Sequence, residues 1–324
     1  MMRMVSTKTI FVVVGLLVIT ASACVAADKE HGTLVQESPI YVSPDLRAAR
    51  VGTATRGLDT FLMERSTIDG KPWAHVLVTI QEGLVYPKQV SGWVDGRFVI
   101  TPSIANGDQI IFGEAQDSER VSEDRNGRKH AGEDAARLYY RLYEYFPTSP
   151  LAGEALWHAA DLRWQLEKAG VFARPSASEM SPDARSEIDE DLMKEVQKKF
   201  PRTKWSDMAA YSLLDNKICG NWKGEPKCPE KESELYEHYA HEHPQSPKAA
   251  EALYNAAWRQ AALVDIYKDQ RQGDKAEKAK RKAIEIAQVI SGKYPDGDWK
   301  PRAAQLIYAL QQGLTTYTVE KSSR

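Results

Sequence analysis

The chain has 324 residues, 42% of them hydrophobic, and a formal net charge of −2. Its 43 basic and 45 acidic residues alternate without a long run of one sign, so the sequence lacks the basic patch typical of nucleic-acid binding. The chain is long enough for two domains with separate cores, and beyond its first 27 residues no stretch approaches membrane-spanning length. We therefore expect no nucleic-acid partner and no membrane contact beyond the N-terminus.

Residues 1–27 have the layout of a secretory signal peptide. Arg3 and Lys8 precede an uncharged apolar stretch at 10–19, and small residues follow at 20–27. A basic start, an apolar centre and a small-residue end are typical of a cleaved export signal. We predict an exported periplasmic protein that is cut after Ala27.

Two alternatives to free export stay open. Residues 21–24 resemble a bacterial lipobox, which would put a lipid on Cys24 and make the chain a membrane-tethered lipoprotein. The uncharged stretch 9–27 is also nearly long enough to serve as an uncleaved membrane anchor. Each alternative still places the remainder of the chain outside the cytoplasm.

Residues 28–104 predict a small β-domain. Short runs rich in strand-forming residues alternate with glycine turns in this segment. The runs lie at 34–35, 40–42, 60–63, 73–79 and 92–99. Closely spaced short strands with glycine turns indicate an antiparallel barrel or sandwich.

The same segment resembles the bacterial SH3-like domain family. In order, the motifs that carry the match are Tyr41-Val42-Ser43-Pro44, Val51-Gly52, Arg56-Gly57, Trp73-Ala74-His75-Val76 and Gly92-Trp93-Val94. The resemblance implies an SH3-like β-barrel that binds peptides or cell-wall stems in a groove lined by aromatic residues, here Tyr41, Trp73 and Trp93. The alternative is that Trp73 and Trp93 fill the barrel core.

Residues 105–324 predict helices arranged in pairs. A ring followed by proline recurs at Phe146-Pro147, Phe200-Pro201, His243-Pro244 and Tyr294-Pro295. Apolar residues stand nine and five positions before each proline, which is one face of a helix that the proline ends. Eight positions after each proline stands an alanine, small enough to let two helices approach closely: Ala155, Ala209, Ala252 and Ala303. Such pairs bury their apolar faces only by stacking, so we predict an all-α solenoid.

Two of these segments resemble the degenerate tetratricopeptide repeats of bacterial envelope proteins. Residues 146–157 and 243–254 each carry the ring and proline, a second proline, and a Glu-Ala-Leu run that ends on an aromatic residue. The resemblance implies a TPR-like solenoid whose curved surface holds protein partners. The intervals between the prolines exceed the roughly 34 residues of a strict repeat, so we expect inserted loops.

A column of mostly aromatic and acidic residues recurs in the helices that follow the prolines. Ten residues after each proline stand Trp157, Tyr211, Tyr254 and Gln305, and the next helical turn adds Asp161, Asp215 and Trp258. On the concave face of a solenoid they would bind a partner helix or an extended peptide. The alternative is that the column packs against the neighbouring helix.

Cys219 and Cys228 are predicted to form a disulfide. They are the cysteines left after Cys24, and both parity and an oxidising compartment favour pairing. The bridge would close a short polar loop with little else to hold it, and would stabilise the fold by roughly 2.5–3 kcal/mol.

No set of residues points to catalysis or to a cofactor. His238, His241 and His243 are close in sequence, but His243 occupies the column of the repeated rings, where packing is expected, so we predict no metal site. Glu154 and Glu251 recur at one repeat position, as a structural role predicts, and no nucleotide or hydrolase motif is present.

The sequence thus predicts a two-domain α+β protein, an SH3-like barrel followed by a TPR-like solenoid. We expect a non-enzymatic scaffold of the cell envelope that binds envelope proteins or peptides. The alternative is an adaptor that holds peptidoglycan and recruits a wall enzyme.

Overall fold

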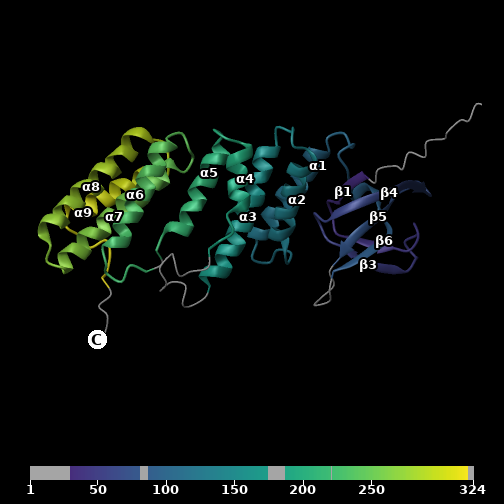
Figure 1. The fold of residues 1–324 in the computed structure, drawn as a ribbon, viewed down its shortest axis with the longest axis horizontal. Coiled ribbons are helices and arrows are strands. Elements are labelled where there is room, and N and C mark those ends of the chain that lie inside the picture. The colour runs from purple at the N-terminus through teal and green to yellow at the C-terminus, as the bar shows by residue number, and fades with distance from the viewer. Residues whose placement is uncertain (1–29, 81–86, 174–186, 220, 320–324) are drawn as a thin grey trace, which may run out of the picture.

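The computed structural model describes residues 30–80, 87–173, 187–219 and 221–319, so the predicted signal peptide and Cys24 lie outside the described residues. The molecule is elongated, with a β-sheet at one end and a row of helices extending from it (Figure 1). Within the described ranges, no helix is both long and apolar enough to cross a membrane.

A curled antiparallel sheet forms the N-terminal part. Its strands are β1 (Glu30–Leu34), β2 (Ser38–Tyr41), β3 (Arg50–Ala54), β4 (Asp59–Ile68), β5 (Lys71–Ile80), β6 (Lys88–Asp95) and β7 (Val99–Ile100). They pair in the order β3-β2-β6-β5-β4-β1-β7, every pairing being antiparallel, and the sheet curls into half a barrel. The predicted antiparallel β-domain is confirmed at this level.

Alternation along the strands decides which side chains form the core of the sheet. Ala74, Val76 and Val78 on β5 point to one face and are at most 2% exposed. They pack with Val94 of β6 and Ile40 of β2 in one apolar cluster. Trp73 and His75, which alternate with them along β5, therefore belong to the opposite face.

Helices follow from residue 107 onward. They are α1 (Gly107–Glu123), α2 (Ala131–Tyr145), α3 (Ala152–Phe172), α4 (Asp191–Lys199), α5 (Lys204–Ser212), α6 (Lys227–Glu242), α7 (Ala249–Asp269), α8 (Gly273–Lys293) and α9 (Trp299–Gln311). Short 3₁₀ turns, η1 (Gly96–Phe98) and η4 (Leu213–Lys217), follow β6 and α5. Successive helices from α1 to α5, and again from α6 to α9, lie side by side along the row (Figure 1).

The ring of each ring-proline dipeptide ends a helix, as predicted. Phe146, Phe200, His243 and Tyr294 are the C-caps of α2, α4, α6 and α8, with φ between −120° and −128° and ψ between 53° and 60°. The proline, which has no N–H to continue the helix, then starts the bend into the next helix. Ala155, Ala209, Ala252 and Ala303 are fully buried where each second helix packs. The predicted helix pairs α2–α3, α4–α5, α6–α7 and α8–α9 are confirmed.

The same rings join each pair to the preceding segment. A Cβ on Gly107 of α1 would lie 2.6 Å from Cζ of Phe146, and one on Gly153 of α3 would lie 3.0 Å from the Phe200 ring. His243 Nδ1 lies 2.8 Å from a carboxylate oxygen of Asp207 on α5. The hydroxyl of Tyr294 donates to a carbonyl in the α6–α7 bend at 3.0 Å. The repeated ring thus has a packing role, which explains why a histidine can take its place.

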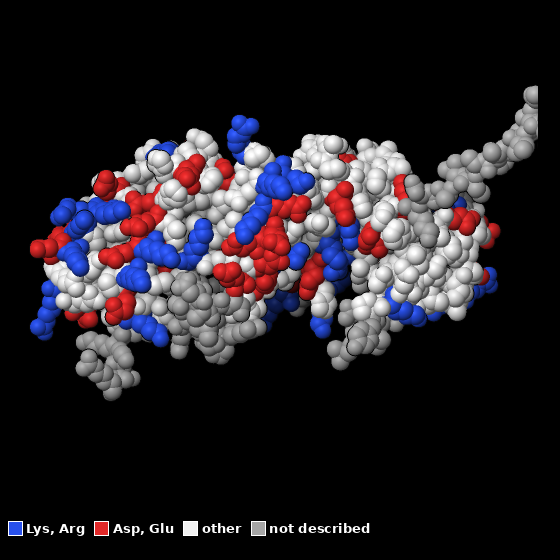
Figure 2. Space-filling view, viewed as in Figure 1, with Lys and Arg blue, Asp and Glu red and all other residues white. Residues whose placement is uncertain are grey.

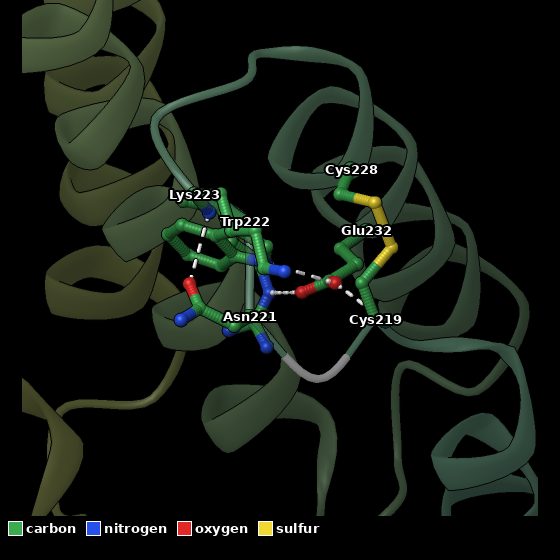
Figure 3. The surroundings of a disulfide bond; sticks show 7 residues. Cys219, Asn221, Trp222, Lys223, Cys228 and Glu232 are labelled. Carbon is green, nitrogen blue, oxygen red and sulfur yellow. Dashed lines mark hydrogen bonds and ion pairs between the residues drawn. A yellow bond between two sulfur atoms is a disulfide. The ribbon is translucent and has the colours of Figure 1, made fainter. Parts of the chain in front are cut away.

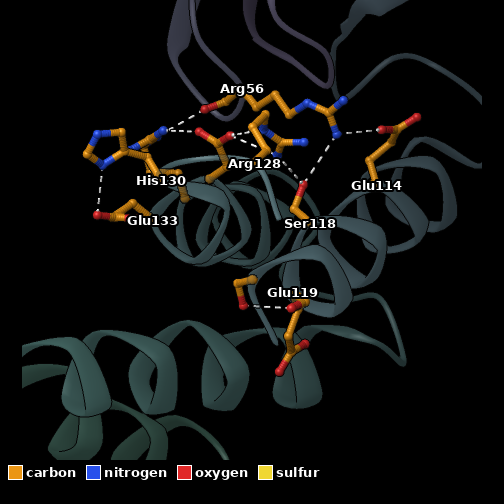
Figure 4. A network of polar contacts seen from close by, with 10 residues as sticks. Arg56, Glu114, Ser118, Glu119, Arg128, His130 and Glu133 are labelled. Carbon is orange, nitrogen blue, oxygen red and sulfur yellow. Dashed lines mark hydrogen bonds and ion pairs between the residues drawn. The ribbon is translucent and has the colours of Figure 1, made fainter. Parts of the chain in front are cut away.

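Polar contacts join the sheet to the first helices (Figure 4). Arg56, in the turn after β3, donates to Glu114 at 3.4 Å and to Ser118 at 3.3 Å on α1. Arg137 of α2 donates to the carbonyl of Arg56 at 3.0 Å. The hydroxyl of Tyr145, at the end of α2, lies 2.6 Å from Asp59 of β4. The sheet therefore packs on α1 and α2 through specific contacts.

Candidate binding sites

The predicted aromatic groove of the β-domain is largely filled by its own side chains. Tyr41 and Trp73 are 4% and 3% exposed, and their rings meet edge to face at 5.9 Å. Arg50 lies over the Tyr41 ring at 5.6 Å and Lys71 over Trp73 at 4.7 Å. For Tyr41 and Trp73 the geometry favours packing over an open groove.

Trp93 is the half-buried member of this aromatic group. It stacks on His75 with ring centroids 5.0 Å apart, and the two residues are directly opposite each other on β6 and β5. His75 is not among the predicted site residues. Its position two residues after Trp73 was the available signal, because alternate residues of a strand share a face.

The predicted helical column divides between two environments. Trp157 and Asp161 of α3 line a cavity of about 470 Å³ together with Tyr211 of α5 and Asp215 of η4. Tyr254 instead packs on Trp299 of α9, with centroids 5.1 Å apart, and Trp258 packs on Trp222 at 5.2 Å. The column therefore forms a pocket in the middle of the molecule and packs against its neighbours farther along.

We call the cavity the Asp161 pocket. The residues that line it include Trp157, Asp161, Trp164, Gln165, Lys168, Met208, Tyr211, Asp215, Tyr236, Lys248 and Glu251. Trp164 stands seven residues after Trp157, on the same face of α3, so helical spacing could have found it. Tyr236, on α6, gave no such signal, because only the stacking of neighbouring pairs brings it here.

Two carboxylates of the pocket are each paired with a lysine. Asp215 accepts from Lys168 at 2.6 Å and from the indole N–H of Trp164 at 3.1 Å. Glu251 pairs with Lys248 at 2.8 Å and accepts from the hydroxyl of Tyr211 at 3.1 Å. Burial, together with Glu251, raises the pKa of Tyr211, so its phenol stays a neutral donor at physiological pH.

Asp161 differs from the other two carboxylates. Gln165 donates to it at 2.5 Å from one turn farther along α3, and within the described ranges it forms no ion pair. Burial raises the pKa of Asp161, and this effect exceeds the opposing influence of the Gln165 hydrogen bond and of the His158 and Lys248 charges. Asp161 is therefore a partly buried acid without its own cation.

Trp157, which lines the pocket, carries an unsatisfied polar group. Its indole N–H is buried, and no acceptor for it occurs in the part of the chain that the structure describes. The ring itself is held firmly, stacked on Trp205 of α5 with centroids 5.3 Å apart. Buried donors in folded proteins are nearly always paired, so this one calls for an explanation.

Another hollow, of about 270 Å³, lies along α2 and α3 and is lined by arginines. Arg137 contacts Asp134 and the carbonyl of Arg56, and Arg141 contacts Glu144 and the carbonyl of Gly57. These two guanidinium groups are therefore engaged in joining α2 to the sheet.

The predicted disulfide between Cys219 and Cys228 is confirmed (Figure 3). The loop between them is held by more than the bridge, contrary to our expectation. The side chain of Trp222 is buried and donates to Glu232 Oε1 at 3.1 Å, and the Cys219 N–H donates to the same oxygen at 2.8 Å. Arg259 of α7 pairs with the other Glu232 oxygen at 2.7 Å. Hydrophobic and ionic contacts thus add to the covalent link.

Two of the histidines singled out by sequence have different partners. The ring of His243 packs against Tyr239 at 4.8 Å and pairs with Asp207, while His238 pairs with Glu242 on the surface of α6. In the described segments, no group of three or more His, Cys, Asp or Glu residues is placed to hold a metal ion.

No family model matches the chain, and no curated protein matches it. We therefore infer function from the geometry of these sites.

Proposed function

We propose that this chain is an exported scaffold protein of the cell envelope that binds protein partners and has no catalytic activity of its own. In this proposal the β-domain is an SH3-like barrel and the helical part is a TPR-like solenoid. The observation that carries the proposal is the Asp161 pocket, where aromatic residues from α3, α5 and α6 surround charged groups between adjacent helix pairs. Stacked helix pairs commonly present such surfaces to partners.

The composition of the pocket supports binding over chemistry. Two of its carboxylates are held in ion pairs with Lys168 and Lys248. A general acid or base needs a free group next to a nucleophile or a second titrating residue in reach of a substrate. Asp161 is hydrogen-bonded to an amide, which suits recognition of charge better than proton transfer.

Site-specific crosslinking in intact cells tests this function. A photo-crosslinking amino acid at Met208, which lines the pocket from α5, should capture one or a few envelope proteins. The same amino acid at Glu277, exposed on α8, is the matched control and should capture none of them. If position 208 captures no protein above this control, the scaffold proposal is wrong.

Two further measurements test other parts of the proposal. The mass of the mature N-terminus reports whether residues 1–27 are removed after Ala27 or whether Cys24 carries a lipid. Incubation of the purified chain with labelled peptidoglycan should release no fragments. Release of fragments would show that the chain is a wall hydrolase and that the scaffold proposal is wrong.

A peptidoglycan-binding adaptor is the second candidate function. The observation in its favour is the Trp93–His75 stack, because a half-buried aromatic pair on a sheet face is suited to stack on sugar or peptide. Retention of the purified chain on isolated sacculi, lost in Trp93→Ala but not in Trp157→Ala, would support this candidate.

A further inference from the structure

The charges of the Asp161 pocket do not balance. Lys168 is paired with Asp215 and Lys248 with Glu251, so the third carboxylate, Asp161, has no cation of its own within the described residues. Removing an ion from water is costly unless an opposite charge accompanies it. The pocket therefore carries one excess negative charge, which one additional cation would neutralise.

The walls of the pocket suit the same kind of ligand. Trp157 and Trp164 are on the same face of α3 as Asp161, and Tyr211 and Tyr236 are contributed by other helices. Aromatic faces attract ammonium and guanidinium groups and pack against the methylene stems that carry them. A volume of about 470 Å³ lies within the usual range of ligand pockets and accommodates a long side chain.

Charge on the surrounding surface favours a basic segment of a protein as the ligand. Acidic side chains gather on the molecular surface near α3 and α4, where they would attract a basic segment (Figure 2).

We propose that the Asp161 pocket binds a lysine or arginine side chain of a partner protein, with the cation on the Asp161 carboxylate and the stem between the aromatic walls. This inference rests on the proposed scaffold function and specifies the chemistry of its partner. Asp161 is the group that selects for charge, and Trp157 and Trp164 select for a long side chain.

Peptide titration of the oxidised, mature chain tests the proposal. The probe is an alanine peptide with one central arginine, blocked at both ends, and the matched probe carries citrulline, which has nearly the same shape without the charge. The arginine peptide should quench tryptophan fluorescence saturably. The citrulline peptide should bind at least about tenfold more weakly, because close charge pairs contribute that much or more to binding.

Variants assign the effect to one carboxylate. Asp161→Asn should weaken binding of the arginine peptide at least about tenfold. Glu123→Gln makes the same charge change at an exposed site on α1 and should leave binding unchanged. The melting temperature of Asp161→Asn should be no lower than that of the parent chain. Weaker binding by the variant then reflects a lost contact and not a loss of folding.

Three results would overturn the inference: equal binding of both peptides, unchanged binding by Asp161→Asn, or no saturable binding of the arginine peptide. Saturable binding of spermidine without binding of the peptide would also overturn it, in favour of a small amine ligand. Crosslinking from Met208 separates these failures from failure of the scaffold function. If the parent and Asp161→Asn chains capture the same partner equally, the scaffold function stands and the inference fails.

Discussion

Glu232 and Asp161 are acids on neighbouring parts of the helical row, and the protein surrounds them in opposite ways. Glu232 is 1% exposed and accepts from the Cys219 N–H, the Trp222 indole and the Arg259 guanidinium. Asp161 accepts from the Gln165 amide and faces a cavity. One carboxylate is fully satisfied by its own chain, whereas the other is left to be satisfied from outside.

The surroundings of Glu232 are closed by several segments. Trp222 packs between Trp258 of α7 and Tyr317 near the C-terminus, with centroids 5.2 Å and 5.3 Å away. Asp265 of α7 accepts from the backbone of Thr316 and Tyr317, which holds that last segment in place. Glu232, with its complete set of partners, organises the fold around it, while the incomplete set around Asp161 marks the site of the ligand that we propose.

The largest effect expected is that of Glu232→Gln. Loss of the charge leaves Arg259 buried without a counter-ion, which typically costs about 3–5 kcal/mol of unfolding free energy. Urea denaturation measures the loss. Glu234→Gln, an exposed site on the same helix, should change stability by no more than about 0.5 kcal/mol. A loss below about 1 kcal/mol for Glu232→Gln would show that this carboxylate does not organise its region.

Removal of the disulfide should have the next largest effect. A Cys219→Ser, Cys228→Ser double variant frees the loop in the unfolded chain, so we expect a loss of roughly 2.5–3 kcal/mol. Because Trp222 and Glu232 also hold the loop, the variant should still fold. Reductant should destabilise the parent chain by a similar amount and leave the double variant unaffected. Equal sensitivity of both to reductant would contradict the assignment.

A smaller loss is expected for Tyr211→Phe in the Asp161 pocket. The hydroxyl of Tyr211 donates to Glu251 and accepts from Asn255, so its removal should cost about 0.5–1.5 kcal/mol. The control is Tyr308→Phe, at a residue that is 60% exposed, and it should leave the melting temperature unchanged. Equal behaviour of the two variants would mean that the pocket is not organised by this network.

Asp161→Asn should have the smallest effect on stability, and of opposite sign. Burial raises the folded-state pKa of Asp161 above its ordinary value of 3.8, so the ionised group destabilises the fold. This penalty is fully present above the raised pKa and absent below 3.8, because there the acid is protonated in both states. The variant should melt slightly higher than the parent at pH 7, and the gain should shrink toward about pH 4. A lower melting temperature at pH 7 would place Asp161 with Glu232 as a structural acid.

Much of the helical architecture could be predicted because its signals are local. A ring before a proline ends a helix whatever surrounds it, and the spacing of apolar residues before the proline identifies the buried face. The ring-proline dipeptides thus placed helix ends correctly, at Tyr145 for α2 and at Lys199 for α4. The disulfide followed from cysteine count and compartment, which also need no knowledge of packing.

The lining of the Asp161 pocket was predicted only in part. Trp157, Asp161, Tyr211 and Asp215 line one pocket as their repeat positions suggested, but Tyr254 and Trp258 pack against other aromatic rings. The inserted disulfide loop places Trp222 against Trp258, and no repeat pattern contains that information. In the β-domain, likewise, the motif located Tyr41 and Trp73 but did not indicate that cations and neighbouring rings cover them.

The sequence alone specifies where the helices before the prolines end, which face of those helices is apolar and which cysteines pair, because these features depend on backbone chemistry and on residues close along the chain. The tertiary structure alone decided that Glu232 meets Arg259 while Asp161 meets no cation within the described residues. Partners of a buried charge come from segments far apart in sequence, and only the stacking of helix pairs brings them within hydrogen-bonding distance.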